Sequence, residues 1–90
     1  MVDVSHYLIE RFVSADACDR VAADACSLQS SATGETHVLL TLYVPEDETC
    51  FHLVDASSRA LVERTSEEAG LAPGRIVAVE ATLGDLGRLR

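Results

Sequence analysis

The sequence predicts a single α+β domain, and three observations support this prediction. The chain has 90 residues, which is enough for one compact core and too short for two domains. Segments with the apolar alternation of strands are interleaved with two segments that have helical periodicity. Gly, Pro and Ser stand between these segments. We therefore expect one domain over residues 1–90, with an ordered core over about 4–83.

The first half of the chain is expected to form a strand, a helix and a second strand. Alternating apolar residues predict the first strand over 4–13. Ser14 provides an N-cap for an Ala-rich helix that ends near Ser31. The apolar stripe expected to face the core comprises Cys18, Val21, Ala22, Ala25 and Cys26. β-Branched and apolar residues predict the next strand over 36–44.

The second half is expected to form a strand, a helix and a strand. An acidic turn at 45–48 leads into a returning strand over 49–54, which makes a hairpin. Ser57 is expected to cap a helix over 58–69, and Gly70 is expected to end that helix in the position after the C-cap. A last strand over 75–83 and a tail at 84–90 follow.

Two strand–helix–strand halves joined by a hairpin are typical of the ferredoxin-like βαββαβ fold. Right-handed crossovers place the strands of the antiparallel sheet in the order 4-1-3-2, with both helices on one face. The other face of the sheet, called the open face below, is then left without a cover. Any chemistry on this face depends on which side chains point toward it.

Alternation of side chains along a strand assigns each residue to one face. We expect the more uniformly apolar set to lie under the helices: Tyr7, Ile9, Val38, Leu40, Leu42, Val44, Phe51, Leu53, Val77, Val79 and Ala81. The open face would carry Leu8, Phe12, Leu39, Thr41, Val54, Ile76, Ala78 and Thr82 among His6, Glu10, His37, Tyr43, Cys50, His52 and Glu80. The hairpin register would set Tyr43 opposite Cys50 and Thr41 opposite His52.

The expected open face is too apolar to be left in water. The core is built from Ala, Val and Leu, with only two Tyr, two Phe and no Trp. A lone domain of this size buries only about 60% of the surface of its unfolded chain. An exposed apolar patch is normally covered by a partner. We therefore expect a homodimer through the open face, a dimeric α+β barrel that encloses a cavity and leaves room for a small hydrophobic ligand.

Three interpretations of the cavity stay open. Imidazole, thiolate and carboxylate groups are ligands of Ni, Zn or Cu ions, which predicts a divalent transition metal held by His52 with some of His6, His37, Glu10 and Cys50. The alternative is a cofactor-independent enzyme of the isomerase, cyclase or monooxygenase type, with acid–base chemistry at His52, Glu10 or Tyr43. A third interpretation gives the histidines only hydrogen bonds across the dimer or a place at its rim. No HxxxH or CxxC motif decides between them.

Composition narrows the classes of partner and compartment. The formal charge of −8 disfavours nucleic acid and anionic lipid, and no apolar run is long enough to cross a bilayer. Three cysteines without paired spacing predict free thiols. All seven basic residues are Arg, as GC-rich actinobacterial codons favour. We expect a cytoplasmic protein without nucleic-acid or membrane partners.

Several short motifs resemble a small bacterial domain-of-unknown-function family that includes an actinobacterial nickel-binding protein. The motifs are Ile9-Glu10-Arg11, Tyr43-Val44-Pro45-Glu46-Asp47, Phe51, Asp55-Ala56, Val62, Ala69-Gly70-Leu71 and Arg75-Ile76, and the resemblance spans most of residues 6–80. It implies a dimeric ferredoxin-like fold and favours a nickel-like metal. One departure is that His52 stands where the family often has Cys, while this chain has its own thiol at Cys50.

Overall fold

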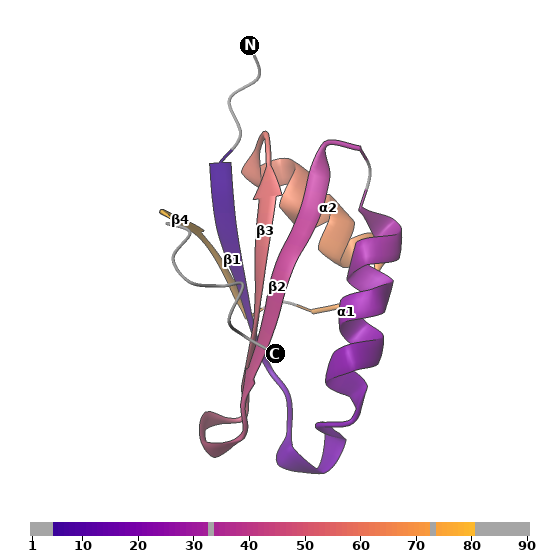
Figure 1. Ribbon diagram of the computed structural model, residues 1–90, viewed down its shortest axis with the longest axis vertical. Helices are drawn as coiled ribbons and strands as arrows, with labels where there is room; N and C mark the ends of the chain where they lie inside the picture. Colours follow the sequence, from indigo (N-terminus) through magenta and orange to yellow (C-terminus); the bar gives the residue numbers. More distant parts are fainter. Residues whose placement is uncertain (1–4, 33, 73, 81–90) are drawn as a thin grey trace, which may run out of the picture.

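The protein has the ferredoxin-like fold that its sequence predicts. A computed structural model describes residues 5–32, 34–72 and 74–80. The elements are β1 (Ser5–Phe12), η1 (Ala15–Ala17), α1 (Arg20–Ser31), β2 (Thr36–Val44), η2 (Pro45–Asp47), β3 (Thr49–Ala56), α2 (Arg59–Glu68) and β4 (Arg75–Val79). The four strands form one antiparallel sheet in the order β2-β3-β1-β4. Both helices lie on the same side of this sheet (Figure 1).

The segment after β1 forms two helical pieces where one helix was expected. The Ser14 hydroxyl accepts a hydrogen bond from the backbone N–H of Asp16 at 3.2 Å, so Ser14 caps the short η1 turn. The longer helix α1 begins only at Arg20 and ends at Ser31, as expected. The cap was assigned correctly, but it belongs to a 3₁₀ turn that precedes α1.

The face that α1 turns toward the sheet also differs from the expectation. Leu28 is its buried residue, and the half-buried side chains occur at the helical spacing of Val21, Asp24 and Ala25. The predicted stripe was wrong in part, because Cys18, Ala22 and Cys26 are exposed. The carboxylate of Asp24 therefore belongs to the side of α1 that faces the sheet.

Helix α2 ends at Glu68 with Ala69 as its C-cap, and Gly70 occupies the position after the C-cap, as predicted. Gly70 has φ +77°, and its N–H donates to Glu67 O, while Leu71 N–H donates to Ser66 O, both at 3.0 Å. These two bonds satisfy carbonyls at the helix end, and glycine adopts the positive φ without strain. At the other end Ser58 provides the cap one residue later than expected, with its hydroxyl accepting from Leu61 N–H.

An apolar core fills the space between the sheet and the helices. It comprises Ile9, Leu28, Val54, Ala56, Val62, Leu71 and Ile76, with Tyr7, Val38, Leu61 and Ala69 packed against it. Ile9 and Tyr7 of β1 lie on the helix side of the sheet, as expected. Val54 and Ile76 were expected on the open face, and this was wrong.

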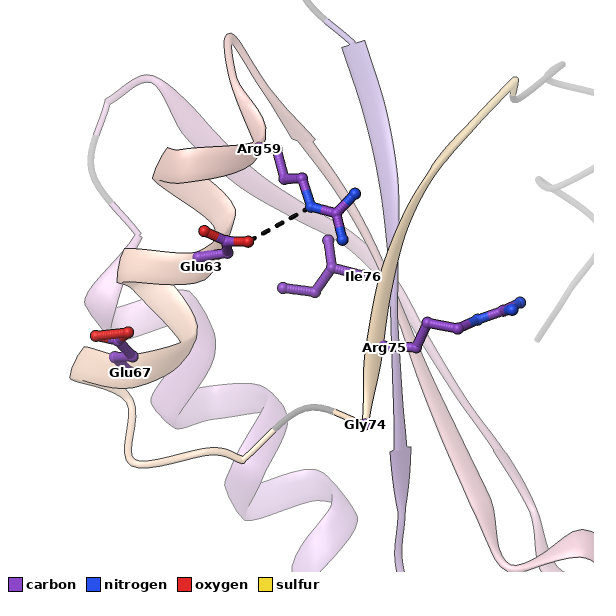
Figure 2. A pocket seen from close by; sticks show the side chains of 6 residues that line it. All are labelled: Arg59, Glu63, Glu67, Gly74, Arg75 and Ile76. Atoms are coloured by element: carbon purple, nitrogen blue, oxygen red, sulfur yellow. Dashed lines mark ion pairs between the residues drawn. The ribbon is translucent and has the colours of Figure 1, made fainter.

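Strands β3 and β4 present the opposite faces to those expected. Along β3 the buried residues are Cys50, His52, Val54 and Ala56. Phe51 and Leu53 therefore belong to the open face. On β4, Ile76 points toward α2 while Arg75 projects to the other side of the strand (Figure 2). The residues 81–83 expected in this strand and the tail at 84–90 lie outside the described residues.

Strand β2 changes face in its middle. The pairing with β3 shifts between Val38 and Leu40, so that Leu39 is an extra residue. Such a bulge reverses the alternation beyond it. Before the bulge, Val38 packs against the core as expected. After it, Thr41 and Tyr43 lie opposite His52 and Cys50 in the predicted register, but on the helix side of the sheet.

Candidate functional site

The open face consists of rows of side chains that run across the strands. One row is entirely apolar, since Leu8 pairs with Val77 and Leu53, and Leu53 pairs with Leu40. The next row toward the η2 end consists of Arg75, Glu10, Phe51 and Leu42. Phe12 and Leu42 are 71% and 52% exposed. A sheet face this apolar is unusual for a surface in contact with water.

The row on the other side of the apolar one carries two histidines and a carboxylate, and we call it the histidine row. His6 on β1 pairs with Asp55 on β3, and Asp55 pairs with His37 on β2. Directly opposed residues have neighbouring side chains, so Asp55 lies between the two imidazoles. His37 Nδ1 is 3.2 Å from Asp55 Oδ1. The backbone pairing of three strands thus assembles this group from distant parts of the sequence.

The contact between His37 and Asp55 leaves one ring nitrogen of His37 available. A carboxylate that accepts from Nδ1–H fixes the ring and its tautomer, and Nε2 then keeps its lone pair. The His37 side chain is 58% exposed and Asp55 is 25% exposed. His37 can therefore offer Nε2 to a ligand that approaches from the open face.

Glu10 lies on the open face, as expected, but apart from the histidine row. It is four residues from His6 along β1, a separation of about 13 Å in a strand. Its Oε2 is 3.5 Å from Arg75 Nη2, in an ion pair at the surface. Glu10 and the histidines therefore occupy opposite ends of the face.

A second polar cluster lies between the sheet and α1. Arg11 Nε donates to His52 Nε2 at 3.1 Å, and Arg11 Nη2 donates to Asp24 Oδ2 at 2.9 Å. The other ring nitrogen, His52 Nδ1, is 2.8 Å from Thr41 Oγ1. Arg11 is 8% exposed and His52 is fully buried. Because Nε2 accepts from Arg11, the proton of the neutral ring is on Nδ1 and is donated to Thr41.

Burial and the charge of Arg11 keep the imidazole of His52 neutral. Burial and the neighbouring Arg11 guanidinium lower the pKa of His52 from 6.5 to about 4. Cys50 Sγ is 3.6 Å from His52 Nε2, and burial raises the pKa of this thiol although Arg11 opposes the shift. An activated cysteine needs a depressed pKa and access to solvent. The Cys50–His52 pair has neither, so its arrangement is that of a packed polar core.

The structure separates the residues that the sequence placed in one cavity. His6, His37 and Glu10 lie on the open face, as expected. His52 and Cys50 lie under the helices, and the expectation that they line the open face was wrong. Tyr43 is also on the helix side, where its hydroxyl donates to Val13 O at 2.8 Å. Glu10 is therefore on the opposite side of the sheet from His52 and Tyr43, and the three residues proposed for acid–base chemistry do not form one site.

Three residues of these clusters were not identified from the sequence. Asp55 lies between the two histidines and contacts His37, and the Arg11–Asp24 pair links the sheet to α1. The hairpin register, extended two pairs beyond the bulge, places Asp55 beside His37. Without knowledge of the bulge at Leu39, the register would pair a different residue with Asp55. Among the described residues, no group of three or more His, Cys, Asp or Glu is placed to hold a metal ion.

Comparison with known proteins supports the fold and no specific activity. No protein-family model matches the sequence, and no curated protein matches it. The chain is similar to SCO4226 from Streptomyces coelicolor A3(2), whose crystal structure superposes with a TM-score of 0.64 at 17% identity. The match covers 88% of this chain and 100% of SCO4226. Over the part of the chain that is described, no helix is long and apolar enough to span a membrane.

Proposed function

We propose that the protein is a homodimer that binds a divalent transition-metal ion, such as Ni²⁺, Zn²⁺ or Cu²⁺, between two histidine rows. The observation that carries this proposal is the row itself, in which Asp55 on β3 lies between His6 on β1 and His37 on β2. Three free cysteines suit a reducing compartment such as the cytoplasm.

The open face supports the dimer. Its central row is apolar across all four strands, and Phe51 and Leu42 extend the apolar surface. Burying apolar area contributes about 25 cal/mol per Å², and the simplest partner for such a face is a second copy of it. Facing sheets would exclude water from both central rows.

The donor chemistry of the histidine row supports the metal. Imidazole nitrogens suit nickel, zinc and copper, and ligating histidines usually donate their other N–H to a carboxylate. Asp55 holds His37 in this way. In our proposal the ligands are the imidazoles of His6 and His37, while Asp55 orients His37.

One protomer supplies two imidazoles, which is too few for a closed site. Structural sites for zinc are almost always four-coordinate. A two-fold axis parallel to the strands would bring the row of one protomer against the same row of its partner. The dimer would then provide four imidazoles to one ion, which predicts half an equivalent of metal per chain.

Isothermal titration of the metal-free, untagged protein with NiCl₂ and ZnCl₂ tests the proposal. We expect saturation at one ion per two chains. His6→Ala and His37→Ala should each reduce the affinity by at least about tenfold, and Asp55→Ala by about 10–100-fold. Glu10→Gln, at the far end of the open face, is the matched control and should leave binding unchanged. Equal affinities of the wild type and both His variants would overturn the assignment.

A further inference from the structure

A pocket of about 250 Å³ opens where β1 meets η1 and α1, away from the histidine row. Its lining residues are Arg11, Phe12, Val13, Ser14, Ala17, Arg20 and Asp24. Three of these are charged, and their sum is positive, because Arg11 and Arg20 outnumber Asp24. This local excess occurs in a chain whose formal charge is −8. The neighbouring acids Asp16 and Asp19 do not line the pocket.

The two arginines of this pocket differ in their contacts. Arg11 is 8% exposed and is held by His52 on one side and Asp24 on the other, so its guanidinium is fixed in place. Arg20 is exposed, and its side chain forms no ion pair with another described residue. The pocket therefore combines one rigid, neutralised cation with one cation that is free to bind an anion.

Another pocket of the molecule has as many acidic as basic residues in its lining. It lies between α2 and β4, with a volume of about 350 Å³, and Arg59, Glu63, Glu67, Arg75 and Ile76 are among its lining residues. There Arg59 Nε is 3.4 Å from Glu63 Oε2, and Arg75 projects away from the α2 side (Figure 2). Arg59 on α2 already has a carboxylate partner, whereas Arg20 has none among the described residues.

We propose that the pocket between β1 and α1 binds a small carboxylate with an apolar body. Arg20 would hold the carboxylate through paired N–H donors, the geometry in which guanidinium binds such anions. Val13 and Ala17 provide apolar surface for the rest of the molecule. A pocket with apolar walls and a few polar groups is typical of small-molecule sites. The proposal does not depend on the dimer or on a metal.

Titration of the ¹⁵N-labelled protein with benzoate, followed by amide NMR shifts, tests this site. We expect saturable shifts at Val13, Ser14 and Ala17. Benzamide, which has the same shape and no charge, should bind about tenfold or more weakly, since a charge-assisted hydrogen bond is lost. Arg20→Gln should weaken benzoate by a similar factor.

Arg64→Gln is the control, because Arg64 is an exposed arginine on α2 and its loss changes the net charge equally. It should leave the benzoate affinity unchanged. Arg20 is exposed, so its variant is expected to keep the amide spectrum of the folded protein. Equal affinity for benzoate and benzamide, an equal effect of the two Arg variants, or no saturable shift up to about 20 mM benzoate would each overturn the proposal.

Discussion

His52 makes the stability of the fold depend on pH. Its pKa is lowered from 6.5 to about 4, first by burial and then by Arg11. Above pH 6.5 the ring is neutral in both the folded and the unfolded chain. As the pH falls below 6.5, the unfolded chain takes up a proton that the folded chain resists, so the free energy of unfolding decreases down to about pH 4.

Urea unfolding of the metal-free protein at pH 7 and pH 5 measures this effect. His52 alone should lower the free energy of unfolding by about 2 kcal/mol over this interval. In His52→Gln this part of the decrease should disappear, although the variant is less stable at pH 7. If the wild type and the variant lose the same amount between the two pH values, His52 is not held neutral.

The cysteines should differ in reactivity because their surroundings differ. Cys18 and Cys26 are exposed, whereas Cys50 is fully buried and its pKa is raised by burial. Since the thiolate is the nucleophile, iodoacetamide at pH 8 should label Cys18 and Cys26 in the native protein and Cys50 only after unfolding. Peptide mass spectrometry reads this out, and labelling of native Cys50 as fast as Cys26 would contradict its placement under the helices.

At the scale of the elements, one largely buried ion pair links α1 to strand β1 of the sheet. Leu28 is the buried residue of this helix, and Asp24 is joined to Arg11 on β1 with side-chain exposures of 14% and 8%. Removing one partner of a buried pair leaves the other charge without compensation. Arg11 would then be buried beside a neutral His52.

Asp24→Asn should therefore destabilise the protein by about 3 kcal/mol and speed hydrogen exchange in α1 more than in α2. The control is Glu63→Gln, which removes an exposed i,i+4 pair with Arg59 and should cost at most about 0.5 kcal/mol. Urea unfolding and exchange mass spectrometry provide the two measurements. Equal destabilisation by both substitutions would show that the Arg11–Asp24 pair does not anchor α1.

The sequence was sufficient for the order of elements and insufficient for the faces of three strands. Apolar periodicity, Ser caps and Gly70 mark element boundaries locally, so the strand order and the hairpin register could be predicted. For each strand, the more apolar of its two sets of alternating residues was assigned to the face under the helices. This rule fails where both faces of the strand are apolar. In β3 it preferred Phe51 and Leu53 to Cys50 and His52, and in β4 it misplaced Ile76.

The β2 bulge could not be foreseen for a different reason. The run Val38, Leu39, Leu40 contains no residue of a polar type that would mark an irregularity, and the extra residue appears only in the pairing with β3. The candidate site was therefore half predicted. His6 and His37 were placed correctly, while the assignment of His52 and the omission of Asp55 both follow from missing tertiary information.

At the scale of the whole molecule, the apolar open face is the feature that a monomer leaves unexplained. Leu42 is 52% exposed there and lies next to Phe51 across the hairpin. If the open faces associate as proposed, Leu42→Glu should convert the dimer to a monomer, because a carboxylate in the interface would be desolvated without a partner. Ala60→Glu, at an exposed position of α2, adds the same charge and should leave the mass unchanged.

Sedimentation equilibrium of the metal-free wild-type protein tests the association of the open faces most directly. We predict a species of twice the 9.6 kDa chain mass at micromolar concentration, which Leu42→Glu reduces to a single chain. A wild-type protein that sediments as one chain would contradict the account, since two histidine rows would then have no means of meeting around one ion.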